Sequence, residues 1–170
     1  MQALPFPECN MLSVKIICVG KMREKYFTDA FQEYARRLSA YCSFESIELQ
    51  EMRLPDRPGE KDIAQALEKE ASAIIRALPK DAYVIALCVE GRKLSSEQLA
   101  ELIRNCENSG RSRICFLIGG SYGMSEKIKQ LADLKLSMSD MTFPHHLARV
   151  MAAEQIYRGF KILEGSAYHK

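Results

Sequence analysis

The sequence predicts a single α/β domain in which a mostly parallel β-sheet is covered by helices on both faces. Segments rich in β-branched residues alternate with segments whose apolar residues recur at helical spacing, which is typical of parallel α/β folds. The apolar runs at residues 83–89 and 113–118 are continuous, as expected of strands buried on both faces. A chain of 170 residues buries about two thirds of its unfolded surface, which suits one domain better than two.

The first half of the chain predicts two strands and two helices in alternation. Residues 14–19 are mostly apolar and β-branched and end at Gly20, so they predict a strand followed by a turn. The apolar residues between positions 27 and 41 recur at helical spacing and predict an amphipathic helix. A second short strand at 44–49 then leads through a loop into a helix over 63–78.

The second half continues the same alternation. Residues 83–89 predict a buried strand, and Ser95 with Gln98 has the spacing of a capping box at the start of the next helix. The run 113–118 predicts a strand that ends in two glycines. After a short helix, the alternating residues 134–138 predict the last strand.

A long final helix over residues 147–164 carries an arginine in an unusual position. On a helical wheel Arg149 falls inside the apolar face, between Ile156 and Phe160. A guanidinium there is desolvated unless it is paired, and the macrodipole of the first helical turn disfavours a cation. Arg149 is therefore either a functional group that meets an anion or a core arginine paired within the protein.

Composition excludes several classes of protein. Hydrophobic residues at 47% and charged residues at 27% are ordinary for a globular protein. No apolar run approaches the roughly 18 residues of a membrane span, and the N-terminus lacks the pattern of a signal peptide. We therefore expect a cytoplasmic protein with no membrane partner. A net charge of +2 does not by itself predict nucleic-acid binding.

Neither the N-terminal segment nor the cysteines predict a functional site. Residues 1–12 have no periodicity and are interpreted as an N-terminal extension, which leaves 13–170 as the single domain. No two cysteines have the C-x-x-C spacing, so all six are expected to be free and mostly buried thiols. They are Cys9, Cys18, Cys42, Cys88, Cys106 and Cys115.

Three loops are candidate binding sites because ligands of parallel sheets bind beyond the carboxyl ends of the strands. They are residues 87–91, 119–123 and 139–146. The glycines of the second loop allow close approach of the backbone, although a simple turn explains them equally well. The third loop offers backbone groups and apolar walls together, which suit a purine ring with a ribose. Adjacent histidines rarely bind one metal ion, so no metal site is expected at His145 and His146.

Several motifs together strongly resemble the RlmH family of 23S ribosomal RNA pseudouridine-N3 methyltransferases, which belong to the SPOUT class. The resemblance covers nearly everything from Val14 onward. The motifs are Val14-Lys15-Ile16-x-x-Val19-Gly20-Lys21, Leu117-Ile118-Gly119-Gly120-Ser121-x-Gly123, Leu136-Ser137-Met138-Ser139-x-Met141-Thr142-Phe143-Pro144-His145, Arg149, Glu154-Gln155-x-Tyr157-Arg158 and Gly165-x-Ala167-Tyr168-His169-Lys170.

This resemblance implies a C-terminal deep trefoil knot, which is a rare exception to the rule against threaded chains. It also implies a homodimer, and the broad apolar face of the final helix agrees with a subunit interface. The implied substrate is a pseudouridine of 23S ribosomal RNA, methylated at N3 on the assembled ribosome. S-adenosyl-L-methionine is the implied cofactor, with contacts at Leu87, Gly119, Gly120, Ser139, Asp140, Met141, Thr142, Phe143 and Pro144.

The chemistry of such a transfer gives roles to the remaining residues. Arg149 is the hypothetical stabiliser of charge on the reacting base, with His145 or His169 as proton acceptor or orienter. Arg158 is expected to hold an RNA phosphate and Tyr168 to stack on an exposed base. Two rival hypotheses remain open. One is an RNA-cleaving enzyme with two catalytic histidines, and the other is a ribosome-associated RNA-binding protein without enzymatic activity.

Overall fold

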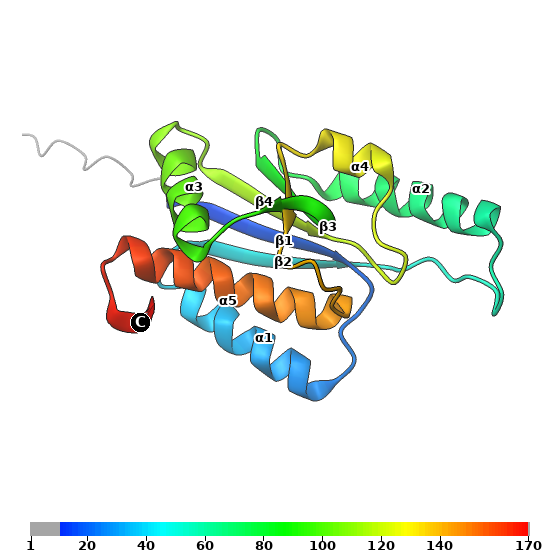
Figure 1. Ribbon diagram of the computed structural model, residues 1–170, viewed down its shortest axis with the longest axis horizontal. Coiled ribbons are helices and arrows are strands. Elements are labelled where there is room, and N and C mark those ends of the chain that lie inside the picture. Colours follow the sequence, from blue (N-terminus) through cyan, green and yellow to red (C-terminus); the bar gives the residue numbers. More distant parts are fainter. Residues whose placement is uncertain (1–10, 170) are drawn as a thin grey trace, which may run out of the picture.

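The computed structural model describes residues 11–169, apart from the side chain of His169 (Figure 1). Strands and helices alternate as predicted. In chain order the elements are β1 (Ser13–Val19), α1 (Lys25–Leu38), β2 (Ser43–Leu49), α2 (Glu60–Ala77), β3 (Tyr83–Lys93), α3 (Ser96–Asn108), β4 (Arg113–Ile118), α4 (Glu126–Leu131), β5 (Leu134–Ser137), α5 (His145–Leu163) and the 3₁₀ helix η1 (Ala167–His169).

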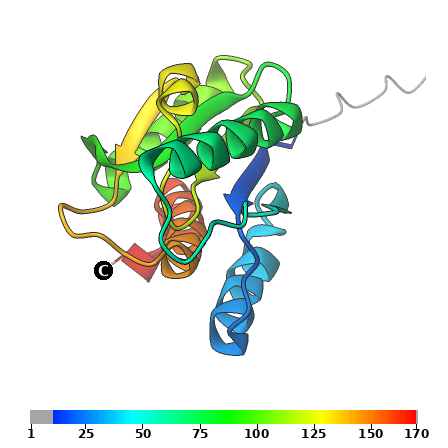
Figure 2. The ribbon, with the colours of Figure 1, turned by 90° about the vertical axis from the view of Figure 1, so that its right-hand side faces the viewer.

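The five strands form one sheet in the order β2-β1-β4-β3-β5. Every neighbouring pair is parallel, so the prediction of a mostly parallel sheet is confirmed. Because all strands run the same way, all of their carboxyl ends meet at one edge, which Figure 2 faces. The loops that we singled out as candidate binding sites therefore lie together on this edge.

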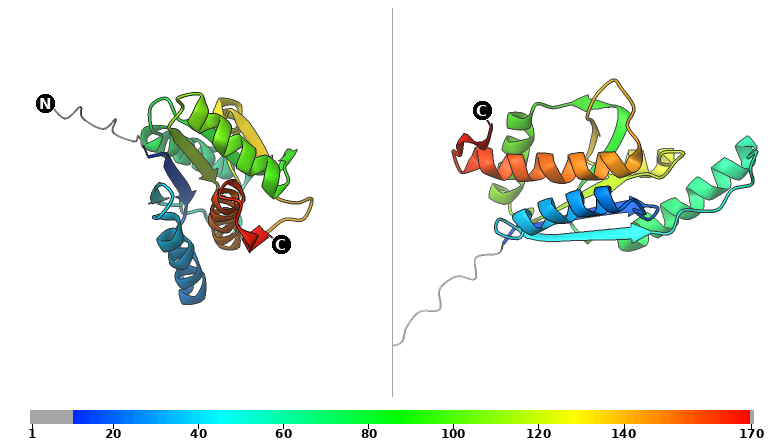
Figure 3. Two further views of the ribbon diagram at one scale, coloured as in Figure 1. Left: turned by 90° about the vertical axis from the view of Figure 1, so that its left-hand side faces the viewer. Right: turned by 90° about the horizontal axis from the view of Figure 1, so that it is seen from below.

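Helices cover both faces of the sheet, as the sequence predicts. One core cluster packs α1, α3 and α5 against the sheet, and a second packs α2 and α4 against the opposite face. Helix α5 lies between α1 and α3 and contacts both (Figure 3). None of the helices within residues 11–169 is both long and apolar enough to cross a membrane.

Local signals place most element boundaries. The Ser95 hydroxyl accepts a hydrogen bond from the Gln98 amide at 3.2 Å, and the Gln98 side chain accepts one from the Ser95 amide at 2.9 Å, so the predicted capping box is confirmed. Pro144 precedes the first residue of α5, where a missing N–H is tolerated.

Strand β3 is longer than predicted. It continues past residue 89 to Lys93 through an irregularity at which Leu136 of β5 pairs first with Leu87 and then with Arg92. A Cβ on Gly91 would lie 2.7 Å from backbone carbon atoms of β5, so only glycine fits this irregularity.

The folded domain begins slightly earlier than predicted. Leu12, which we had included in the extension, is 2% exposed and belongs to the core on the α5 side of the sheet. The rest of the predicted extension, up to residue 10, lies outside the described residues. All five cysteines within the described part are free, and four of them are buried. Cys9 lies outside that part.

Candidate active site

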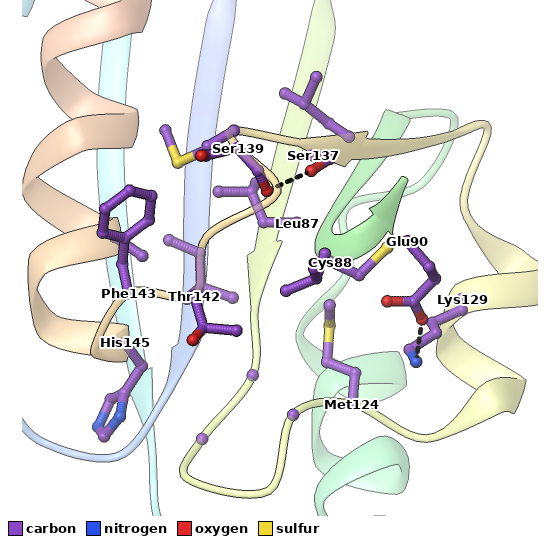
Figure 4. Close-up of a pocket in the computed structure, with 18 of the residues that line it drawn as sticks. Leu87, Cys88, Glu90, Met124, Lys129, Ser137, Ser139, Thr142, Phe143 and His145 are labelled. Carbon is purple, nitrogen blue, oxygen red and sulfur yellow. Dashed lines mark hydrogen bonds and ion pairs between the residues drawn. The ribbon is translucent and has the colours of Figure 1, made fainter. Parts of the chain in front are cut away.

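A cavity of about 350 Å³ opens at the carboxyl ends of β3, β4 and β5 (Figure 4). Strands β3 and β4 are neighbours whose following helices cover opposite faces of the sheet, and such an arrangement opens a crevice between their loops. The cavity is large enough for a small-molecule ligand. Its walls come from the three predicted loops and from the first turn of α5.

Most residues predicted to contact a cofactor line this cavity, and two do not. Asp140 is largely exposed and forms an ion pair with Lys93 outside the cavity lining. Pro144 lies at the N-terminal end of α5 and is also absent from the lining. The predicted residues that do line the cavity are Leu87, Gly119, Gly120, Ser139, Met141, Thr142 and Phe143.

Residues 120–123 form a tight turn, closed by a hydrogen bond from the Gly123 amide to the Gly120 carbonyl oxygen at 3.0 Å, and close contacts also leave little room for side chains at 119 and 120. A Cβ on Gly119 would lie 2.3 Å from the carbonyl oxygen of Gly123. A Cβ on Gly120 would lie 2.8 Å from Glu51 Oε1, which accepts a hydrogen bond from the Ser121 amide at 2.8 Å. The loop therefore presents bare backbone to the cavity.

The loop between β5 and α5 is held by its own serines. The buried Ser137 hydroxyl donates a hydrogen bond to the carbonyl oxygen of Ser139 at 2.9 Å. The Ser139 hydroxyl in turn accepts one from the Met141 amide at 3.1 Å. These bonds fix the path of the backbone along the cavity, so its free polar groups are positioned before a ligand arrives.

An ion pair that the sequence did not predict lies on the opposite side of the cavity from His145 (Figure 4). Lys129 of α4 donates to Glu90, and this hydrogen bond holds the pKa of Glu90 below its ordinary value. Nearby, burial raises the pKa of the Cys88 thiol, which stays neutral. Glu90 falls within the candidate loop 87–91, but Lys129 lies 39 residues further along the chain. No local sequence pattern therefore predicts that the two side chains pair.

His145 forms one wall of the cavity at the start of α5. Burial lowers the pKa of its imidazole, and the electrostatic effects of its neighbours His146 and Arg149 lower it further. The ring is therefore neutral near pH 7 and able to accept a proton. The neighbouring His146 is engaged elsewhere, because its Nδ1 lies 3.0 Å from Glu24 Oε2.

Arg149 lies beneath the site and does not line the cavity. Its guanidinium is 1% exposed and donates to the carbonyl oxygens of Val19 at 2.8 Å and Gly20 at 2.6 Å, and to Glu48 Oε1 at 2.9 Å. Glu48 Oε1 also accepts a hydrogen bond from the Met22 amide at 3.0 Å. These contacts favour the alternative of a paired core arginine, which ties α5 to the carboxyl ends of β1 and β2.

The two residues expected to bind RNA lie together but far from this cavity. Arg158 donates to Glu154 at 3.0 Å, and its guanidinium carbon lies 5.0 Å from the centre of the Tyr168 ring. Arg158 lies thirteen positions after His145 in α5, which corresponds to roughly 20 Å along a helix. His169 ends η1, and its side chain lies outside the described part of the chain.

Comparisons with known proteins agree with this architecture. The sequence model of the family described as "Predicted SPOUT methyltransferase" matches residues 12–169. The ribosomal RNA large subunit methyltransferase H of Clostridium novyi (strain NT) is 47% identical over 159 residues, which are 94% of this chain and 100% of that protein. The protein of the same name from Clostridium botulinum (strain Alaska E43 / Type E3) is 45% identical over the same shares.

A solved structure shows the same fold at low sequence identity. The crystal structure of a probable methyltransferase from Bordetella pertussis Tohama I has a TM-score of 0.57 at 15% identity, and the match covers 86% of this chain and 93% of that one.

The parallel sheet, the cavity at its carboxyl edge and the match over residues 12–169 define a protein of the SPOUT methyltransferase class. Within this class, the chain belongs to the family of ribosomal RNA large subunit methyltransferase H proteins. The resemblance found in the sequence motifs is thereby confirmed.

Proposed function

We propose that this protein uses S-adenosyl-L-methionine to methylate N3 of a pseudouridine in 23S ribosomal RNA, on the assembled ribosome in the cytoplasm. Relatives named ribosomal RNA large subunit methyltransferase H align with it over their whole length. The observation that carries the proposal is the cavity at the carboxyl edge of β3, β4 and β5. It brings bare backbone, apolar walls and a neutral histidine to one place.

The cavity fits the cofactor in size and in chemistry. Leu87 and Phe143 supply apolar surface for a flat purine ring, and the loop from Ser139 to Thr142 supplies main-chain groups for its edge. The Glu90 carboxylate is an acceptor for ribose hydroxyl groups or a counter-charge for a cation. When bound, S-adenosyl-L-methionine supplies an electrophilic methyl group on a sulfonium.

His145 is the proposed proton acceptor. The N3 atom of a pseudouridine base is an imide nitrogen, which must lose its proton when it forms a bond to the methyl group. His145 lines the cavity, and its lowered pKa leaves it unprotonated near pH 7. His169 remains the second candidate acceptor, supplied by the C-terminal tail.

Arg149 has a positioning role in this proposal. Its two terminal nitrogens are already bonded to Val19, Gly20 and Glu48, and the residue does not line the cavity, so we assign it no contact with the base. It holds the end of β1 against α5, and its positive charge helps to keep His145 neutral. This replaces the direct electrostatic role that the sequence alone suggested.

We further propose that the active unit is a homodimer. Val89, Tyr122 and Met141 line the cavity yet are 48%, 50% and 69% exposed, so they form an apolar rim that a second subunit would cover. Arg158 and Tyr168 lie at the far end of α5 from the cavity of their own chain. We infer that they bind RNA at the cavity of the partner subunit.

The trefoil knot of SPOUT proteins also belongs to this proposal. The loop 119–123 and the connection from β5 to α5, which are the segments that such a knot would bring together, both line the cavity.

The test is mass spectrometry of digested 23S ribosomal RNA from a strain in which the gene for this chain is deleted. We expect one pseudouridine to lose one methyl group, and the chain supplied from a plasmid to restore it. Unchanged masses at every base would favour a ribosome-associated protein without enzymatic activity. Strand scission of RNA by the purified protein, together with no binding of S-adenosyl-L-methionine in calorimetry, would favour the RNA-cleaving enzyme.

A further inference from the structure

A second cavity, of about 670 Å³, lies beside the first at the carboxyl ends of β1 and β2. Its walls are the loop after β1 (residues 20–24), the loop after β2 (residues 50–53) and the start of α5. His145 lines this cavity as well as the first one, so its imidazole forms part of a wall that the two cavities share. Both cavities are lined by loops at the carboxyl ends of the strands, and this edge of the sheet faces the viewer in Figure 2.

Three cations line the second cavity without a counter-charge. The side chains of Lys21, Arg23 and Arg53 are exposed, and within residues 11–169 none of them has a hydrogen bond or an ion pair. By contrast, Lys129 and Arg149 around the first cavity are each paired with a glutamate. The unpaired cations are therefore available to an anionic ligand.

The two carboxylates of the second cavity are already engaged by the protein. Glu24 Oε2 lies 3.0 Å from Nδ1 of His146, and Glu51 Oε1 accepts a hydrogen bond from the Ser121 amide at 2.8 Å. Burial alone would raise the pKa of Glu51, but the hydrogen bonds from Ser121 outweigh it, so the pKa of Glu51 is lowered and this group is charged. An anion that enters this cavity is therefore expected to contact the three unpaired cations.

We propose that the second cavity binds the acceptor strand of the RNA, with Lys21, Arg23 and Arg53 on its phosphates and the target base against His145. This inference rests on the proposed function, since it names the place where the same methyl transfer receives its substrate. Phosphate contacts position a strand and supply affinity, while the wall shared with the first cavity selects which base reaches the methyl donor.

Gly20 keeps the shared wall open on the RNA side. Its φ of +91° lies in the region that favours glycine, and a Cβ there would lie 3.5 Å from His145 Nε2 and 3.4 Å from Glu51 Oε2. Glycine therefore leaves open the space between His145 Nε2 and the Glu51 carboxylate that a side chain at this position would fill. A base that enters from the second cavity reaches His145 at the wall of the first cavity. Its reacting nitrogen then lies next to the proposed methyl donor, and direct displacement requires the two to be close and aligned.

Binding of the protein to large ribosomal subunits from the deletion strain tests this inference. The double variant Lys21→Gln/Arg53→Gln is compared with the wild type in the presence of S-adenosylhomocysteine, from about 50 to 200 mM salt. We expect affinity to fall at least about tenfold at the lower salt, and the slope of log affinity against log salt to become shallower by about two. The matched control is Arg76→Gln, an exposed cation at the end of α2, near the opposite edge of the sheet.

The outcomes separate this inference from the proposed function. Equal affinity and equal salt slope in the double variant and the wild type overturn the inference, and so does an equal loss in the Arg76→Gln control. Calorimetry with S-adenosyl-L-methionine should give the same affinity for the double variant as for the wild type, because the three cations lie outside the first cavity. A wild type that binds subunits but transfers no methyl group would contradict the proposed function, while the comparison of affinities would still decide where the RNA binds.

Discussion

At the scale of single residues, Arg149 determines how the end of β1 is held. We expect Arg149→Met to lower the free energy of unfolding by about 3 kcal/mol, because the buried carbonyl oxygens of Val19 and Gly20 lose their donor. Glu48, whose side chain is 38% exposed, can be solvated by water and adds less. Urea denaturation of the wild type and the variant measures the change.

The control for this prediction is Arg36→Met, an exposed arginine whose partner Glu33 is also bonded to Arg37. It should leave the unfolding transition unchanged. If Arg149→Met unfolded like the wild type while turnover was lost, Arg149 would instead act on the reacting base, as the sequence first suggested.

The lowered pKa of His145 predicts how activity and stability depend on pH. The unfolded chain binds a proton at this imidazole near pH 6.5, and the folded chain binds it only at lower pH. The contribution of His145 to stability is therefore complete above pH 6.5 and is lost as the pH falls below it. The value of kcat/KM should fall over the same lower range, where the proposed proton acceptor becomes charged.

The comparison of the wild type with His145→Gln checks both effects. The variant should lose most of its turnover and should show a smaller difference in unfolding free energy between about pH 8 and about pH 5. An acid limb of kcat/KM that lies above pH 6.5 would contradict the assignment of His145 as the acceptor.

The sequence predicted that Arg149 needs a partner but not which one. A cation inside an apolar helix face is recognisable from local spacing alone. Its acceptors at Val19 and Glu48 lie 130 and 101 residues away in the chain, so only the assembled sheet brings them together. The same reasoning applies to Lys129, which reaches Glu90 across 39 residues.

At the scale of elements, the glycine loop after β4 lines the first cavity, where we propose that the cofactor binds. We expect Gly119→Ala to weaken S-adenosyl-L-methionine binding at least about tenfold, since a Cβ placed 2.3 Å from the Gly123 carbonyl oxygen must shift the backbone that lines the cavity. Isothermal calorimetry measures the affinity. Gly59→Ala is the matched control, because a Cβ there would make only an ordinary contact of 3.6 Å with Asp62. Equal affinities in both variants would show that the loop does not contact the cofactor.

The order and type of the elements could be predicted because periodicity and capping are local properties of the chain. The extension of β3 to Lys93 could not be predicted from the sequence. The apolar run that predicts the strand ends at residue 89, and the polar Glu90 and Arg92 do not continue its pattern. The cause of the extension is the pairing of β3 with β5 on both sides of the irregularity at Gly91. Such pairing depends on a strand that comes more than forty residues later.

At the scale of the whole molecule, the sheet gathers both cavities at one edge and leaves Arg158 and Tyr168 about 20 Å away at the other end of α5. The sequence motifs predict that these two residues contact RNA, but sequence cannot decide which subunit of the proposed homodimer they serve. That decision depends on how two copies pack, which no spacing along one chain encodes.

Mixed dimers decide which subunit supplies the tail. Gly119→Ala impairs the cavity and leaves the tail intact, whereas Tyr168→Ala impairs the tail and leaves the cavity intact. If the tail serves the partner's cavity, co-expressed variants should recover about a quarter of wild-type methyl transfer, because half of the dimers are mixed and each has one complete site. If the tail serves its own chain, mixed dimers contain no complete site and the mixture should be no more active than either variant alone. Recovery near the level of the separately purified variants would therefore contradict the proposed exchange of tails between subunits.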